Sequence, residues 1–119
     1  MEAVWERARE LGRVLGQSDE YKAVQRAKER LSGDREIVTH LNRLGELEAE
    51  IGRMLQRGEE PPQATAEEYE TIFGEVQSRP EYQSLVAAQT NFDKILARVN
   101  EEISKGMTTA AQSRIILPS

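Results

Sequence analysis

The sequence contains no cysteine, which excludes disulfides, thiolate-bound zinc and cysteine-ligated iron–sulfur clusters. Aromatic residues make up only 5% and histidine occurs once, so there is little material for a large aromatic core or a metal site. The longest run of large aliphatic residues, 115–117, is far too short to span a bilayer. In a chain of 119 residues these absences predict one modest domain, and we expect no cofactor and no membrane insertion.

A stripe of one charge sign is also missing. The 16 basic and 21 acidic residues are interspersed and leave a net charge of −5. Proteins that bind nucleic acid directly usually carry a basic stripe, so we expect no direct binding to DNA or RNA, and none to an anionic membrane surface. The acidic, amphipathic N-terminus lacks the basic and apolar regions of a secretory signal. A cytoplasmic location is therefore predicted.

What the sequence does contain is helical periodicity. Charged residues make up 31%, and together with few aromatics this favours long amphipathic helices. The pattern predicts an all-α fold of about five helices in an elongated bundle, with two long amphipathic helices at about 35–57 and 80–105. Helices of this kind expose much surface for their core, and sharing an apolar seam between two chains is a common remedy. We therefore predict a homodimer or a higher homo-oligomer.

Local signals mark where these helices begin and end. Ser18 and Asp34 are suited to cap helices that follow them, and Gly58 is a natural stop for the helix before it. Thr65 followed by Glu68 has the spacing of a capping box, which predicts that the fourth helix starts at Thr65. Gly106 is the predicted end of the last helix. The predicted domain is thus 1–106, and the tail 107–119 is either docked on a groove or disordered.

Two helices carry seams in which spacings of three and four residues alternate, the pattern of a helix that presents one side to a partner. These residues are our candidates for packing or self-association. In the last helix they are Tyr82, Leu85, Gln89, Phe92, Leu96, Val99 and Ile103. In the third helix they are Ile37, Leu41, Leu44, Ile51 and Leu55. Side by side, the two seams predict one helical core that continues across a dimer.

Three residues have two interpretations each. Gln89 and Glu48 are polar positions within the seams: either they set register or oligomeric state, or they lie at the edge of the seam and reach water. We expect the edge position. Trp5 is either an exposed binding residue or part of the core, and core packing is the prediction because a first helix that folds back would bury it.

Candidate chemistry is sparse. His40 has one carboxylate, Glu36, four residues before it, and one histidine with one glutamate does not make a metal site. No glycine-rich phosphate loop or nucleophile motif occurs, and adjacent carboxylates such as Glu67 and Glu68 point about 100° apart on a helix. We predict no catalytic residue, no metal and no small-molecule substrate, and so no enzyme.

The chain resembles the YlbF/YmcA family of small bacterial helical proteins, which includes YheA-like members. The resemblance covers residues 2–106. Upstream it rests on Ala8-Arg9-Glu10-Leu11-Gly12 and on Ser18, Glu20, Tyr21, Val24 and Ala27. Downstream it rests on Arg79-Pro80, Tyr82, Leu85, Ala87, Phe92, Ile95-Leu96, Val99-Asn100 and Ile103-Ser104.

The resemblance implies an all-helical, dimeric or larger regulator. Its best-known members act in bacterial control of competence, biofilm formation and sporulation, within a complex that adjusts RNA processing by RNase Y. Some members carry iron–sulfur clusters on cysteines, and that cofactor does not transfer to a chain without cysteine. The expected function is a non-enzymatic regulatory adaptor acting through helix-mediated protein–protein interactions. The alternative is a structural or chaperone-like helical oligomer without a dedicated partner.

Overall fold

Helices account for nearly all of the chain in this computed structural model, which describes the backbone of residues 1–116 and the side chains of residues 1–112. In chain order they are α1 (Glu2–Gly16), α2 (Asp19–Ser32), α3 (Arg35–Gln56), α4 (Gln63–Gln77) and α5 (Pro80–Ile116). No strand occurs within residues 1–116, which confirms the all-α prediction and its five helices.

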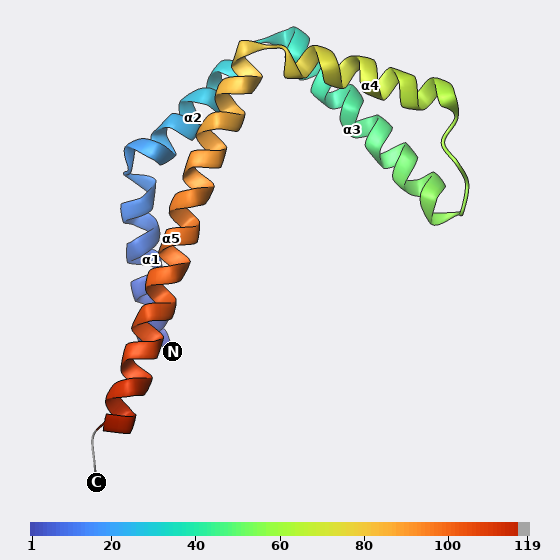
Figure 1. Cartoon of the computed structure of the whole chain (residues 1–119). Coiled ribbons are helices and arrows are strands. Elements are labelled where there is room, and N and C mark those ends of the chain that lie inside the picture. Colours follow the sequence, from blue (N-terminus) through green and yellow to red (C-terminus); the bar gives the residue numbers. More distant parts are fainter. Residues whose placement is uncertain (117–119) are drawn as a thin grey trace.

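The five helices form two arms that meet at a bend (Figure 1). The stalk consists of α1, α2 and α5, the hairpin consists of α3 and α4, and residues 33–34 and 78–79 form the elbow between them. The principal extents are 71 × 38 × 24 Å and the radius of gyration is 21.6 Å. A compact domain of this length would have a radius of gyration of about 14 Å. The chain is therefore elongated, as its long amphipathic helices predict.

Most helix boundaries follow the local signals. The Ser18 hydroxyl accepts a hydrogen bond from the Tyr21 amide, and the Asp34 carboxylate accepts bonds from the amides of Glu36 and Ile37. These bonds satisfy amide groups that the first turn of a helix leaves without a partner. Gly58 has a φ of +74°, the left-handed conformation that ends α3 without a side-chain clash.

The capping box at Thr65 is a wrong prediction, because α4 starts at Gln63. Pro62 takes the cap position. Its carbonyl oxygen accepts hydrogen bonds from the backbone amides of Thr65, at 3.0 Å, and Ala66, at 3.2 Å. The Glu68 carboxylate, which the box needs at its own helix start, instead binds a guanidinium on α3. A contact between two helices thus takes the side chain on which the local motif depends.

The last helix is longer than predicted: α5 starts at Pro80 as expected but continues through Gly106 to Ile116. Within the described residues only Gly58 has a positive φ, so Gly106 keeps helical geometry, at a cost of about 1 kcal/mol relative to alanine. The described part of the predicted tail therefore extends α5, and 117–119 lie outside the described residues. None of the helices described, α5 included, combines the length and the apolarity that crossing a bilayer requires.

The core is small and divided between the arms. In the stalk, α2 and α5 pack along their length and bury Val24, Ala27, Leu31 and Phe92. In the hairpin, α3 and α4 bury Ile37, Leu44, Leu47 and Val76. Each arm thus has its own set of buried side chains.

Candidate functional site

The α3 seam is largely covered within the chain. Ile37 and Leu44 are buried, with Ile37 0% exposed, and Leu41 and Ile51 are half-buried. Only Leu55, at the far end of the hairpin, is open to solvent, with 61% of its surface exposed. The reason is that α4 runs back along α3 and places its own apolar residues against it. Little of this seam is left for a second chain.

Polar contacts tie the hairpin together outside this seam. Arg43 donates to both carboxylate oxygens of Glu68, at 2.6 Å from Nε and 3.0 Å from Nη2. This bidentate bond raises the pKa of Arg43, and the same bond lowers the pKa of Glu68. The Tyr69 hydroxyl donates to Glu48 at 2.9 Å, which raises the pKa of Tyr69. Glu48 is exposed and lies at the seam's edge, as expected.

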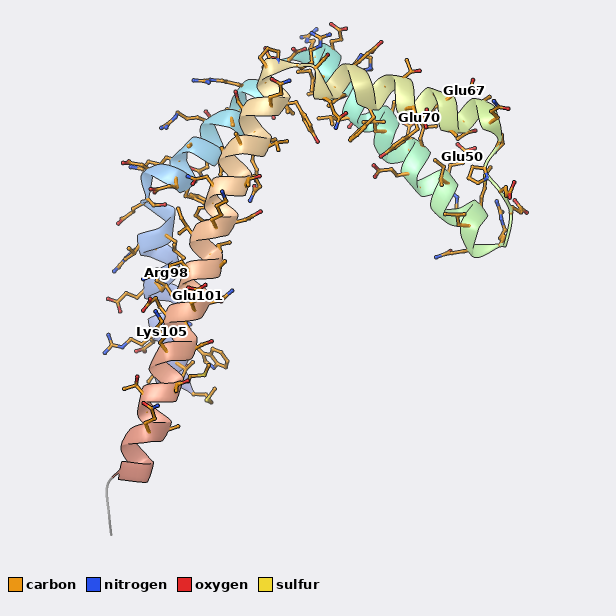
Figure 2. The ribbon with its side chains drawn as sticks, viewed as in Figure 1. Glu50, Glu67, Glu70, Arg98, Glu101 and Lys105 are labelled. Atoms are coloured by element: carbon orange, nitrogen blue, oxygen red, sulfur yellow. The ribbon has the colours of Figure 1, made fainter. Side chains whose placement is uncertain are left out.

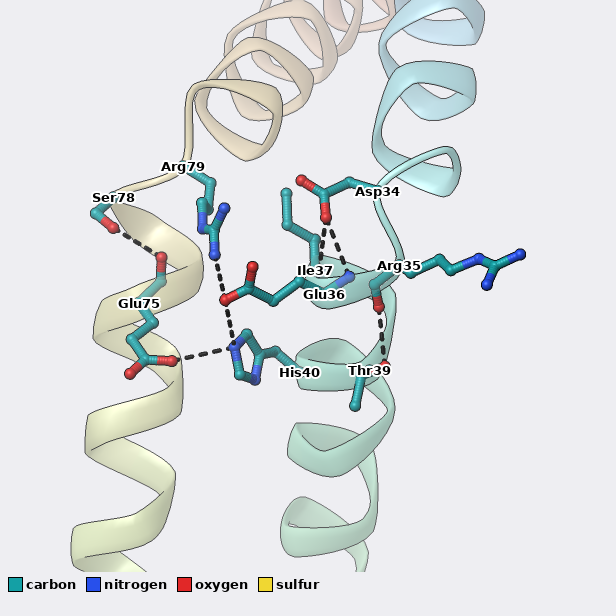
Figure 3. Close-up of polar contacts among 9 residues, drawn as sticks. All are labelled: Asp34, Arg35, Glu36, Ile37, Thr39, His40, Glu75, Ser78 and Arg79. Atoms are coloured by element: carbon teal, nitrogen blue, oxygen red, sulfur yellow. Dashed lines mark hydrogen bonds and ion pairs between the residues drawn. The ribbon is translucent and has the colours of Figure 1, made fainter.

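A second polar cluster joins the arms at the elbow (Figure 3). Arg79, just before α5, contacts the carboxylate of Glu36 on α3 at 2.5 Å, and this bond raises the pKa of Arg79. On the next turn of α3, His40 places its buried Nε2 atom 3.1 Å from Glu75 on α4, without the alignment of a hydrogen bond. The contact becomes an ion pair when the imidazole is protonated. The cluster links α3, α4 and the start of α5.

In the elbow cluster the predicted pair of Glu36 and His40 is joined by a second carboxylate, that of Glu75. His40 Nε2 lies 3.8 Å from Glu36, whose oxygen Arg79 already contacts. Among the residues described, no group of three or more histidine, aspartate or glutamate side chains could hold a metal ion. The cluster brings side chains of α3, α4 and Arg79 together where the two arms meet.

The α5 seam differs from the α3 seam because α2 covers only the first part of the α5 seam. Phe92 is buried, with its ring centroid 5.3 Å from that of Tyr21 on α2. The seam residues Tyr82, Leu85, Gln89 and Val99 are half-buried. The remaining two, Leu96 and Ile103, are 37% and 48% exposed. The amide of Gln89 donates to Asp93 on its own helix at 3.0 Å, so this polar seam residue finds a partner without a second chain.

The second half of α5 extends past the end of α2 and runs beside α1, but it does not pack closely on α1. In the described part of the chain no Cα atom of α1 lies within 8 Å of one of α5. A groove of about 480 Å³ separates them, lined by Leu11 of α1 and by Ile95, Arg98, Val99, Glu102 and Ile103 of α5. α1 has no buried residue, and Trp5 is 51% exposed. The prediction that Trp5 packs in the core is therefore wrong for the single chain, because α1 stands away from α5.

We call the exposed apolar residues of the two helices beside this groove the stalk face. They belong to α1 and to residues 96–107 of α5, and they are Val4, Trp5, Leu11, Val14, Leu96, Ile103 and Met107. The rim is charged: Arg98 contacts Glu102 at 3.0 Å, and Lys105 contacts Glu102 at 3.4 Å, while neighbouring Glu101 is not part of this chain of contacts. Figure 2 shows Arg98, Glu101 and Lys105 on this part of α5.

The two seams do not meet. α3 pairs with α4 and α5 pairs with α2, so each seam lies in a different arm. The prediction of one core shared by both seams is wrong because the elbow turns α3 away from α5. Sequence reasoning expected the first helix to fold back on the core, and it gave no sign that the apolar side of this helix stays open. It also missed the segregation of charge between the arms: residues 34–79, which form the hairpin and part of the elbow, hold 11 acidic and 5 basic residues.

These features define an elongated all-helical protein with two arms and one open apolar face. The chain belongs to the YlbF/YmcA family: the family described as "Control of competence regulator ComK, YlbF/YmcA" matches residues 4–108. This confirms the resemblance read from the sequence motifs. The family is thus described by a regulatory role, in control of a competence regulator, and not by an enzyme class.

Two relatives are known as UPF0342 proteins. One, from Leuconostoc citreum (strain KM20), is 21% identical over 107 residues, which cover 90% of this chain and 91% of the relative. Another, from Oenococcus oeni (strain ATCC BAA-331 / PSU-1), is 25% identical over 104 residues, which cover 87% of this chain and 91% of the relative. The similarity spans both arms in each case.

Proposed function

We propose that this chain is a non-enzymatic, cytoplasmic regulatory adaptor that acts as a homodimer or larger homo-oligomer through helix-mediated protein–protein interactions. The process it regulates belongs to bacterial control of competence, and to the connected control of RNA processing, biofilm formation and sporulation. Support comes from membership of a family described by control of the competence regulator ComK. The role with RNase Y known for some members is a further proposal for a chain without cysteine.

The observation that carries the proposal is the amount of exposed apolar and acidic surface on the two arms. Among the residues whose side chains are described, eight hydrophobic residues are buried while ten large hydrophobic ones are exposed. Apolar surface that gathers in one region of a protein usually marks a site of interaction. The arms also differ in charge, because α4 carries four acidic residues and no basic one. Two surfaces of different character suit a protein that contacts more than one partner.

The test is affinity purification from the native bacterium with the whole chain as bait, followed by mass spectrometry. A matched second bait carries Glu67→Lys and Glu70→Lys, which reverse exposed charges on the half of the hairpin remote from the elbow (Figure 2). We expect the wild-type bait to recover specific proteins at physiological salt, and the double variant to recover fewer of those with basic surfaces. Recovery of no specific protein by either bait would overturn the adaptor proposal.

The alternative, a structural or chaperone-like oligomer, draws support from the stalk face, which offers apolar surface without an evident selective feature. It predicts that the chain suppresses aggregation of unrelated unfolded proteins. It also predicts that the two baits recover the same proteins. An adaptor gives the opposite results, with a defined partner set and no protection of unrelated proteins, so the same purified samples distinguish the two functions.

A further inference from the structure

The stalk face is unusual within this molecule because it gathers nearly all of the open apolar surface. Of the ten large hydrophobic residues exposed among those described, eight lie on α1, on the N-terminal methionine or on residues 96–107 of α5. The other two, Leu55 and Val86, lie apart, at the far end of the hairpin and on the first turns of α5. The groove between α1 and α5 is lined by two residues of the stalk face, Leu11 of α1 and Ile103 of α5.

The size of this face is close to what a dimer needs. Its seven side chains are about half exposed, and with about 90 Å² for each aliphatic side chain and about 200 Å² for the tryptophan they offer on the order of 400 Å² of apolar surface. A standard interface buries about 800 Å² per partner, of which about 55–65% is apolar, or about 500 Å². The stalk face therefore supplies most of the apolar part of such an interface before its charged rim is counted.

The distribution of charge along the chain favours contact between the stalks of two copies over contact between their hairpins. Residues 34–79, which form the hairpin and part of the elbow, carry 11 acidic and 5 basic residues, a net charge of −6. The rest of the chain carries 10 acidic and 11 basic residues, a net charge of +1. Two copies that meet through their stalks bring nearly neutral surfaces together. Copies that met through their hairpins would instead bring two strongly negative surfaces into contact.

From the open groove, its area and this charge distribution, we propose that the stalk face is the docking site of a second copy of this chain. The same face of both copies takes part, so the interface is isologous, with α1 and the second half of α5 of one copy seated on those of the other. This inference names the surface of the dimer in the proposed function and rests on that dimer. It leaves both hairpins outside the interface, free for other partners.

The chain contains its own probe, because Trp5 is the only tryptophan and belongs to the stalk face. Docking moves its half-exposed indole out of water, so we expect the fluorescence maximum to shift to the blue as the dimer forms. The full-length chain is diluted from about 100 µM to about 0.1 µM, and mass by light scattering is followed with emission in the same samples. The two readouts should share one midpoint.

The decisive variant is Ile103→Glu, with Leu55→Glu as the matched control on the other arm. Both positions are exposed aliphatic residues, 48% and 61% respectively, so neither substitution disturbs a buried site in the single chain. A residue at the centre of an interface contributes a factor of about 30 or more to affinity, and each substitution occurs twice in a two-fold dimer. We expect Ile103→Glu to weaken the dimer about 1000-fold and Leu55→Glu to leave it unchanged.

The outcomes separate this inference from the dimer itself. A wild-type chain that is monomeric throughout the dilution series overturns both. If the wild-type chain is a dimer but Ile103→Glu does not weaken it, or Leu55→Glu abolishes it, then the dimer exists and the stalk face is not its site. Loss of the dimer on truncation before Ser113 would make the tail the occupant, and would overturn the inference in the same way; we expect this truncation to keep the dimer.

Discussion

Replacing Leu47 by alanine tests whether the hairpin is a packed arm in its own right. Leu47 lies on the buried side of α3 and is 1% exposed. The substitution removes three carbon atoms, so the lost transfer free energy is about 2.4 kcal/mol, and the cavity left behind raises the total to about 3 kcal/mol. Domains of this size are stable by about 5–15 kcal/mol, so this is a large fraction of the total.

The matched control is Leu55→Ala on the same helix. Because Leu55 is 61% exposed, only the covered part of the side chain contributes, and the expected loss stays below about 1 kcal/mol. Urea unfolding followed by circular dichroism measures both, at one protein concentration, because any dimer makes stability depend on concentration. The expected result is a lower midpoint for Leu47→Ala with an unchanged slope. Equal losses in the two variants would refute the packing of α3 on α4.

Three further predictions concern local contacts. Ser18→Ala should cost about 1 kcal/mol of unfolding free energy, and Thr65→Ala less than about 0.5 kcal/mol, since only Ser18 makes a cap bond; thermal melts of both variants measure this. The bond from Arg43 lowers the pKa of Glu68 from 4.5, so the advantage of wild type over Glu68→Gln is present above pH 4.5 and is lost as pH falls through the lower folded value. Urea midpoints at neutral and acidic pH test this, and a difference that persists in acid would contradict it. Gln89→Leu should leave the mass in light scattering unchanged, because Gln89 bonds along its own helix; a changed mass would give it the register role.

Helix boundaries proved the most predictable part of the fold, because they depend on neighbouring residues. The caps of Ser18 and Asp34 and the stop at Gly58 each involve bonds or angles within a few residues. The start of α4 could not be found in this way, because Glu68 bonds to Arg43, 25 positions earlier in the chain. Gly106 shows the converse: a weak local stop signal is overridden when the residues on both sides favour helix.

The arrangement of the helices, and with it the candidate site, was less predictable. A repeat of three and four residues says that a helix has a partner on one side, but it does not say which helix that partner is. Ile37 and Phe92 carry the same signal and are both buried, but the helix of Ile37 packs mainly on α4 and the helix of Phe92 mainly on α2. Contacts at the elbow that separates them, such as that of Arg79 with Glu36, join distant segments and have no local pattern.

Helix length explains why one seam is complete within the chain and the other is not. α3 has 22 residues and α4 has 15, so at 1.5 Å per residue α4 covers about two-thirds of its partner. α2 has only 14 residues against the 37 of α5, which leaves more than half of α5 to be covered by something else. α1 could cover part of it, but no Cα atom of α1 approaches α5 within 8 Å in the described chain. The unmatched length of α5 is therefore the structural feature that calls for a second protein surface, and the position of Ile103 within it makes that residue the most informative one to change.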